Sequence, residues 1–163
     1  MLRHYLTVKA EHPDAILLYR MGDFFELFFE DATTAAPVLD VALTARQKGT
    51  ASEAPMCGVP HHAVDAYIAR LLDAGYKVAV CDQVEDPAQA RGLVRREVTR
   101  VVTPGTISDL EMLDQNRPNY LAGVRFNGGA GAGAFLDVST GEFFVRRWSD
   151  AALAVDDLER LSP

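Results

Sequence analysis

Two side chains near the amino terminus, Phe24 and Glu26, are of types suited to recognising a ligand. They lie in an aromatic and acidic run, residues 21–29, directly after an apolar stretch. Gly22 can break a strand, and Asp23 with Glu26 resembles a capping box at the start of a helix. The pattern allows two interpretations. The run either begins a well-capped helix over a hydrophobic core or holds a phenylalanine and a glutamate at the tip of an element for recognition.

Two other groups of residues are of types that bind metals. A zinc-type site is conceivable, but it lacks close CxxC or HxxxH pairs, so buried thiols and surface histidines are the favoured interpretation. Its ligands would be Cys57, His61, His62 and Cys81. A metal-dependent nuclease is the competing enzymatic hypothesis, although nothing in the spacing of its carboxylates demands that they converge. Those carboxylates would be Asp23, Glu26, Asp137 and Glu142.

The charge is acidic overall and basic in patches. A formal net charge of −7 argues mildly against nonspecific polyanion binding by the whole chain. Arginines cluster between residues 91 and 100, and Arg46 and Lys48 lie in a loop that contains glycine. Such patches can meet phosphate, while a solvated basic face is the favoured explanation of each patch taken alone.

Composition places the chain among globular proteins. Its 163 residues suffice for one or two domains with a real core, and 48% are hydrophobic and 24% charged. No apolar run approaches membrane-spanning length, and no signal-peptide pattern opens the chain. The two cysteines suit a reducing compartment. We therefore predict a cytoplasmic protein without a membrane partner.

Alternating patterns predict a mixed α/β domain in the first two thirds of the chain. A helix from Asp23 to Leu39 would bury Phe25, Phe28 and Phe29 on one face, with Glu26 opposite and Phe24 at the margin. Around it we expect a first helix before Pro13, strands at 15–19, 41–45, 76–84 and 97–103, a loop at 46–54, and a helix from Pro60 to Gly75.

The sequence pattern changes from alternating strands and helices to consecutive strands after a plausible linker at residues 116–119. Strands are expected at 120–126, 133–138 and 142–148, followed by a helix from about Asp150. Three strands and one helix make a thin core. We therefore predict one domain at residues 1–115 and the incomplete start of a second at residues 116–163.

Several blocks together resemble one family. Arg20 to Phe28 resembles the amino-terminal signature of MutS-type DNA mismatch repair proteins, and five further blocks follow in the family's order at similar spacing. These blocks are residues 54–64, 80–87, 100–106, 119–122 and 137–141. The resemblance covers nearly the whole chain. It implies a mixed-sheet amino-terminal domain with flanking helices, followed by a truncated α/β connector domain of the RNase H-like type.

The resemblance also implies functional residues. The family's mismatch-reading Phe-x-Glu motif falls on Phe24 and Glu26, so Phe24 is expected to stack on a mispaired or unpaired base and Glu26 to hydrogen-bond it. Arg46, Met56 and Gly58 match loop positions near DNA, and Arg46 could position a phosphate. For Met56, core packing is an equal alternative. Small departures from the family are Phe25 in place of a commoner tyrosine and the unusual pair His61-His62. We favour strand-surface roles over phosphate contacts for Arg96 and Arg100.

The implied recognition is physically reasonable. A ring wedged between base steps kinks the duplex, and unstacking costs a few kcal/mol, which is less at a mismatch that has already lost pairing. A carboxylate near DNA repels phosphates, so Glu26 is expected to contribute specificity and not affinity. In a continuous helix, residues two apart point roughly 200° from each other. Phe24 and Glu26 can therefore share a target only at a helix tip or in extended chain.

Partners and cofactors follow from the resemblance as well. Mismatched double-stranded DNA is the expected ligand, with a homodimer and the partner MutL expected for the full-length protein in the bacterial cytoplasm. Family members are ATPases, but the sequence contains no GxxxxGK[ST] motif. ATP and magnesium are therefore expected only outside these residues, and no enzymatic activity is expected for this part of the protein.

Overall fold

The computed structural model describes residues 1–50, 53–85, 92, 94–104 and 118–163. The chain forms two compact units, Met1–Thr103 and Pro104–Pro163. The predicted domain boundary at residues 115 and 116 lies outside the described residues and stays a prediction. Within the described ranges, no helix is both long and apolar enough to cross a membrane.

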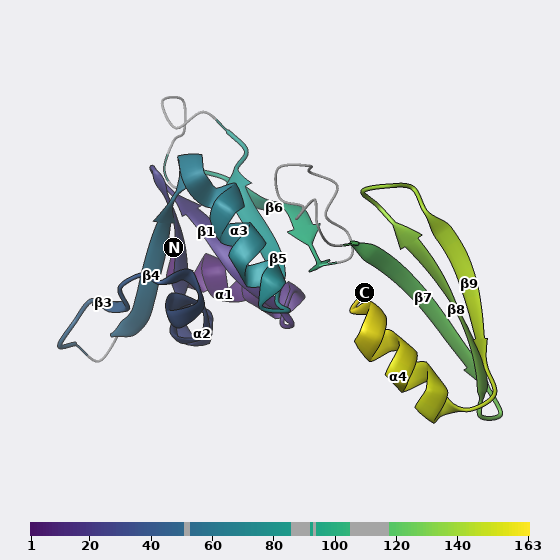
Figure 1. Ribbon diagram of the computed structural model, residues 1–163. Helices are drawn as coiled ribbons and strands as arrows, with labels where there is room; N and C mark the ends of the chain where they lie inside the picture. Colours follow the sequence, from purple (N-terminus) through teal and green to yellow (C-terminus); the bar gives the residue numbers. More distant parts are fainter. Residues whose placement is uncertain (51–52, 86–91, 93, 105–117) are drawn as a thin grey trace. The chain divides into compact units, whose positions relative to one another are not determined.

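The first unit is built on a six-stranded mixed sheet in the order β3-β4-β2-β1-β5-β6 (Figure 1). Its strands are β1 (Ala15–Met21), β2 (Phe24–Phe28), β3 (Thr44–Arg46), β4 (Ala54–Pro60), β5 (Lys77–Gln83) and β6 (Arg96–Val102). Only β1 and β5 run parallel, and the other neighbours pair antiparallel. This confirms the predicted α/β class with a mixed sheet, and it places β2 in the interior of the sheet.

Helices cover both faces of this sheet. In Figure 1, α1 (Leu2–Glu11) lies behind the strands and α3 (Val64–Asp73) in front of them. The helix α2 (Phe29–Leu39) lies on the α3 side, where the Cys57 thiol of β4 lies 3.7 Å from the carbonyl oxygen of Ala32. A short 3-10 turn, His61–Ala63, joins β4 to α3. Helices were predicted over both α2 and α3; their ends, at Leu39 and just before Gly75, are confirmed, whereas both begin later than predicted.

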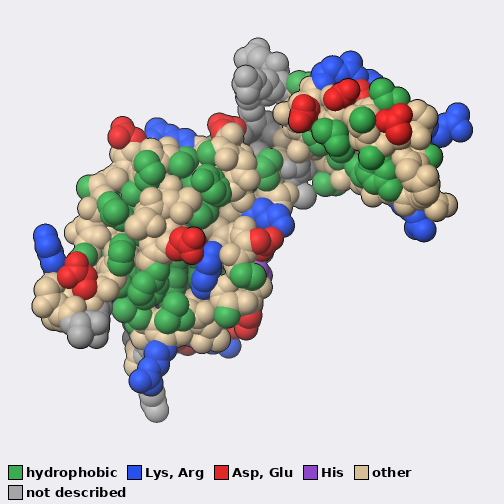
Figure 2. Space-filling view, turned by 90° about the horizontal axis from the view of Figure 1, so that it is seen from below, with side chains coloured by type: hydrophobic (Ala, Val, Ile, Leu, Met, Phe, Trp, Pro, Cys, Tyr) green, Lys and Arg blue, Asp and Glu red, His purple; other side chains and the backbone are tan. Residues whose placement is uncertain are grey.

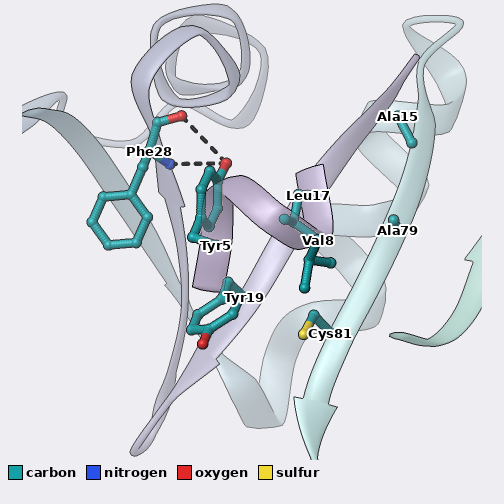
Figure 3. Close-up of a cluster of buried hydrophobic side chains, with 8 residues drawn as sticks. All are labelled: Tyr5, Val8, Ala15, Leu17, Tyr19, Phe28, Ala79 and Cys81. Carbon is teal, nitrogen blue, oxygen red and sulfur yellow. Dashed lines mark hydrogen bonds between the residues drawn. The ribbon is translucent and has the colours of Figure 1, made fainter. Parts of the chain in front are cut away.

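The side chains beneath α1 form a compact aromatic and aliphatic core (Figure 3). Tyr5 and Val8 of α1 pack on alternate residues of β1 and β5, with Phe28 of β2 beside them. The Tyr5 ring meets Tyr19 and Phe28 edge-on, at ring-centre distances of 5.8 and 5.1 Å. Because α1 is only ten residues long, it covers this face at the Phe28 end of β2, whereas Phe24 at the other end is 47% exposed.

The structure corrects the prediction for residues 23–28. They do not begin a helix. Phe24–Phe28 is a strand, and the helix starts only at Phe29. The aromatic residues fitted a helical stripe because both faces of the sheet bury side chains of β2: Phe25 and Phe28 are both buried although they point to opposite sides. Neighbouring strands override the local capping signal.

The stretch that follows the predicted loop at 46–54 also needs correction. Residues 54–60, expected to lead from a loop into a helix, form β4, which pairs with both β2 and β3. The short strand expected at 41–45 is Thr44–Arg46. Sequence alternation missed β4 because Pro55, Gly58 and Pro60 are residues that usually interrupt strands. The sequence also predicts a turn or short helix that opens at Asp86 and a turn at residues 103–106; residues 86–91 and 105–106 lie outside the described residues.

The second unit contains β7 (Tyr120–Asn127), β8 (Ala130–Asp137), β9 (Phe143–Trp148) and α4 (Ala151–Leu161). The strands form an antiparallel meander, as predicted. The carboxylate of Asp150 caps α4 by accepting a hydrogen bond from the backbone N–H of Leu153, at 3.0 Å. The Trp148 indole N–H donates to Asp157 at 2.9 Å, and this bond is the main cause that lowers the pKa of Asp157 to about 2.

Candidate functional site

A tight turn presents Phe24 at the end of the sheet. Strands β1 and β2 are joined by Gly22 and Asp23 alone, with Met21 paired to Phe24. Gly22 has a φ of 59°, the positive value that the first central residue of such hairpin turns requires and that a side chain disfavours. The ring of Phe24 therefore follows directly after the turn, exposed at the margin of the sheet.

Strand geometry places Phe24 and Glu26 on the same face. Successive strand residues point to opposite faces, so residues two apart share one. Phe25 and Leu27 point into the core on the other side and are buried. The condition that Phe24 and Glu26 lie in extended chain is thus met along β2 itself, and not at a helix tip.

Strand pairing brings the other predicted residues to this face. Gly58 of β4 is paired with Glu26, and Met56 is paired with Phe28. On β3, Arg46 is paired with Ala54, which has the same parity on β4 as Met56 and Gly58. All five predicted residues therefore share one face of the sheet; they are Phe24, Glu26, Arg46, Met56 and Gly58. Figure 2 shows one side of the first unit, where apolar side chains lie together with acidic and basic ones.

The Glu26 carboxylate is partly desolvated and incompletely paired. Its side chain is 19% exposed. Its Oε2 atom is buried and has no hydrogen-bond partner among the described residues. Burial raises the pKa of Glu26, and the positive charge of Arg46 opposes this shift without cancelling it. A carboxyl group in this state can accept a hydrogen bond from a ligand or, once protonated, donate one.

Arg46 is the nearest cation to this carboxylate. Its Nη1 atom lies 3.6 Å from Oε2 of Glu26, which is an ion pair but too long for a hydrogen bond. The same nitrogen lies 4.0 Å from the sulfur of Met21. With 36% of its side chain exposed, Arg46 reaches over the sheet toward Glu26 while remaining accessible to an anion.

Gly58 keeps the space beside the pair open. A Cβ atom placed there would lie 3.7 Å from Cγ of Glu26 and 3.9 Å from Cδ1 of Phe24, which is ordinary contact distance. Met56 is partly buried and packs against the core beneath α1, as the core-packing alternative expects, while its DNA role stays a prediction.

Two residues at this site were not predicted. Met21 ends β1, pairs with Phe24 and packs partly on the core. Pro60 pairs with Phe24 from β4. The signal that would have found them is alternation counted outward from Phe24, which requires knowing that residues 24–28 form a strand.

The remaining basic and histidine candidates are used in other ways. Arg96 is buried, its Nε donates to the carbonyl of Arg20 at 2.7 Å, and its guanidinium stacks over Tyr19. This corrects the favoured prediction of a surface charge, because the strand carbonyls hold the side chain inward. Arg100 is exposed and pairs with Asp65, as a surface charge would. The backbone N–H of His61 donates to the carbonyl of Asp23 at 2.9 Å.

The conceivable metal sites are not assembled in the described residues. Cys57 lies on the α2 side of the sheet and Cys81 beneath α1, so the sheet separates them. In the second unit, Asp137 accepts hydrogen bonds from the backbone N–H and the hydroxyl of Ser139. No three acidic, histidine or cysteine side chains of the described ranges converge as a metal site would require. The structure thus adds no support to the nuclease alternative.

Known proteins share this sequence closely. The family described as MutS domain I matches residues 1–111, the range that holds all five site residues. The chain belongs to the MutS family. It is 54% identical over 166 aligned residues to the DNA mismatch repair protein MutS of Syntrophobacter fumaroxidans, and 51% identical over 164 to that of Desulfatibacillum aliphaticivorans. Both alignments cover 100% of this chain, but only 19% and 18% of the respective relatives.

A third MutS relative has the same character. The DNA mismatch repair protein MutS of Nitratidesulfovibrio vulgaris strain DP4 is 57% identical over 145 residues, which are 88% of this chain and 16% of the relative. The chain thus spans less than a fifth of the length of these MutS proteins. The identified part is MutS domain I, with further residues beyond its match.

Proposed function

We propose that this part of the protein recognises mismatched double-stranded DNA in mismatch repair, with Phe24 as the wedge and Glu26 as the base contact. One observation carries the proposal: β2 presents two suitable groups on one face. The Phe24 ring is exposed, and Oε2 of Glu26 has no hydrogen-bond partner among the described residues. Membership of the MutS family supports it.

Phe24 has the properties that a wedge needs. It is apolar, it is 47% exposed, and it lies beside a two-residue turn. Inserted between base steps from the minor groove, its ring would unstack them at a cost of a few kcal/mol. A mispaired or unpaired base has already lost part of this stacking. Preference for the mismatch then arises because the mispaired site costs less energy to deform than matched duplex.

Glu26 supplies selectivity on the same face. Its negative charge repels phosphates on any duplex, so it weakens binding to matched DNA. At a displaced base, its oxygen finds the hydrogen-bond partner that it lacks among the described residues. The raised pKa of Glu26 also makes a protonated, donating carboxyl accessible. Arg46 is assigned a phosphate contact, and Gly58 leaves the room for the base to approach.

The remaining family properties are proposed for the whole protein. These are ATP hydrolysis with magnesium outside these residues, homodimer formation with one Phe-x-Glu meeting the mispair, contact with MutL, and action in the bacterial cytoplasm on the nucleoid. Residues after about 118 are proposed to begin a connector domain of the RNase H-like type. The meander β7-β8-β9 with α4 on one face is compatible with that start.

The test compares the affinities of the full-length protein for mismatched and matched duplexes. We expect Phe24→Ala to lower the ratio of affinities for a G·T or single-base-loop duplex over matched duplex by about tenfold, the loss of one aromatic–base stack. Glu26→Ala should lower the same ratio mainly by tightening binding to matched duplex. Full preference in Phe24→Ala would exclude the wedge.

Matched controls separate recognition from general surface effects. Phe143→Ala removes another exposed phenylalanine, 64% exposed in the second unit, and should leave the ratio unchanged. Glu30→Ala removes an exposed carboxylate on α2, away from the site, and should change matched and mismatched binding equally. A drop in the ratio for either control would show that the assay does not isolate the site.

A further inference from the structure

The chain changes from strand to helix in one step, between Phe28 and Phe29. Phe28 still has extended backbone angles, whereas Phe29 has a φ of 54° and is already the first residue of α2. A positive φ is unfavourable for a residue with a side chain, and Phe29 is not the Asn, Asp or Gly that tolerates it best. Something outside this segment must therefore hold the junction.

The hydroxyl of Tyr5 lies at this junction (Figure 3). The backbone N–H of Phe28 donates to it at 3.3 Å, and the Phe28 carbonyl oxygen lies at the same distance. The hydroxyl has one proton, and the carboxylate of Asp31, at 2.8 Å, is the closer acceptor. Tyr5 thus links the last residue of β2 to the first turn of α2.

Asp31 connects this contact to the rest of the unit. It is 4% exposed and accepts hydrogen bonds from the Lys9 ammonium at 2.8 Å and from the backbone N–H of Leu17 at 3.1 Å. Its position in the first turn of α2 also suits the positive end of the helix dipole. A buried carboxylate with charge-assisted bonds from α1 and β1 is a rigid anchor for the start of α2.

The local sequence favours a different arrangement. Asp23 and Glu26 match a capping box, and the apolar spacing after them fits a helix that begins at Asp23. If α2 extended back over these residues, Phe24 and Glu26 would point roughly 200° apart. A slip of one residue in β2 would turn both side chains to the opposite face. The position of the junction therefore decides whether ring and carboxylate can act on one base.

We infer that Tyr5 is a positioning residue for mismatch recognition: through Asp31 it fixes the strand-to-helix junction at Phe28 and Phe29, and so keeps Phe24 and Glu26 on one face. This rests on the function proposed above. The Tyr5 side chain faces the sheet from α1 and is 1% exposed, so its role is to act through other residues. Its hydroxyl acts through the backbone of Phe28, two residues along the strand from Glu26.

The test is Tyr5→Phe, which keeps the ring and removes the hydroxyl. In the full-length protein, the preference for a G·T over a matched duplex should fall about two- to tenfold, because the variant loses the energy of about one hydrogen bond. Amide hydrogen exchange in the free protein should speed up at Phe28 and along β2, but not along β5. Unchanged preference and unchanged exchange would overturn the inference.

Tyr19→Phe is the matched control. Tyr19 is equally buried in the same core, and its hydroxyl bonds the ring Nδ1 of His4 at 2.9 Å instead of the junction. It should keep the mismatch preference within about twofold. An equal loss in Tyr5→Phe and Tyr19→Phe would mean that the effect comes from any missing buried hydroxyl, and would overturn the inference.

A second variant distinguishes positioning from simple loss of stability. Phe29→Gly removes the side chain that makes the positive φ unfavourable, so Tyr5→Phe combined with Phe29→Gly should regain most of the preference, although it loses more packing. A further decrease would contradict the inference. If Tyr5→Phe alone does not fold, the inference is tested with the double variant Tyr5→Phe, Phe29→Gly. This double variant should retain at least about half of the wild-type mismatch preference, and a larger loss would overturn the inference.

The outcomes also separate this inference from the proposed function. Phe24→Ala and Glu26→Ala are measured in the same assay. If they leave the preference intact, the proposed function fails, whatever Tyr5→Phe does. If they reduce it and Tyr5→Phe does not, the wedge stands and only the positioning role of Tyr5 is lost.

Discussion

The sheets of the two units both expose apolar side chains, but the two exposed surfaces differ in chemistry. In the first unit, exposed Phe24 lies beside the incompletely paired carboxylate of Glu26 and the cation of Arg46. In the second unit, the face of the sheet opposite α4 carries exposed aliphatic and aromatic residues in register across the strands. They are Leu121, Leu136, Phe143 and Val145.

The difference shows why exposure alone does not identify a binding site. The second surface has more exposed apolar residues, and the one buried side-chain atom without a hydrogen-bond partner among the described residues of that unit, Nδ2 of Asn119, precedes β7 and belongs to a neutral amide. The first surface combines a single ring with a desolvated carboxylate that raises the energy of the free protein. A ligand can relieve that cost, so the first surface carries the stronger functional inference.

The largest expected effect contrasts the two ends of β2. Phe28→Ala removes a fully buried ring and should lower the free energy of unfolding by about 3–5 kcal/mol. Phe24→Ala should change it by less than about 0.5 kcal/mol, because Phe24 is 47% exposed and lies outside the buried core. Urea unfolding followed by circular dichroism measures both. Similar losses in the two variants would show that Phe24 is part of the core, and the comparison would fail.

The next effect has the opposite sign and concerns Glu26. Since its pKa is raised in the folded protein, folding favours the protonated form, and stability falls as pH rises from the ordinary value of 4.5 through the folded value. Glu26→Gln should therefore raise the free energy of unfolding by about 0.5–2 kcal/mol near neutral pH. Below the ordinary pKa the two proteins should converge.

Unfolding at about pH 7.5 and about pH 3.5 tests this sign. Glu30→Gln, an exposed carboxylate, is the control; because it removes a first-turn charge that suits the helix dipole, it should not be more stable than wild type at the higher pH. If Glu26→Gln were less stable than wild type at the higher pH, the ion pair with Arg46 would outweigh desolvation, and the site would not be strained in the free protein.

The smallest effect is expected on the surface of the second unit. Phe143→Ser should alter the free energy of unfolding by less than about 0.5 kcal/mol and leave mismatch preference unchanged. Phe135→Ser, in the buried core of the same sheet, should destabilise the protein strongly. A thermal melt of both variants checks the contrast. A large loss of stability in Phe143→Ser would mean that this exposed face is covered in the full-length protein.

Much of the architecture could be predicted from periodicity and breakers. The apolar run at 15–19, the helix ending before Gly75 and the meander after residue 120 were all confirmed. The predicted boundaries of helices and strands were wrong where the local sequence signal favoured one structure and pairing with neighbouring strands imposed another. The capping pair at Asp23 and Glu26 suggested a helix, and the prolines of β4 hid a strand. Both errors concern the strands that form the candidate site.

The sequence by itself determined which residue types are available near the amino terminus, and the resemblance of its motifs indicated the family. Tertiary structure alone decided that Phe24 and Glu26 share a face. A segment that can form either a capped helix or a strand takes the second form because β1 and β4 supply hydrogen bonds on both sides and Tyr5 holds its end. Strand pairing is non-local, so no pattern within residues 21–29 could reveal it.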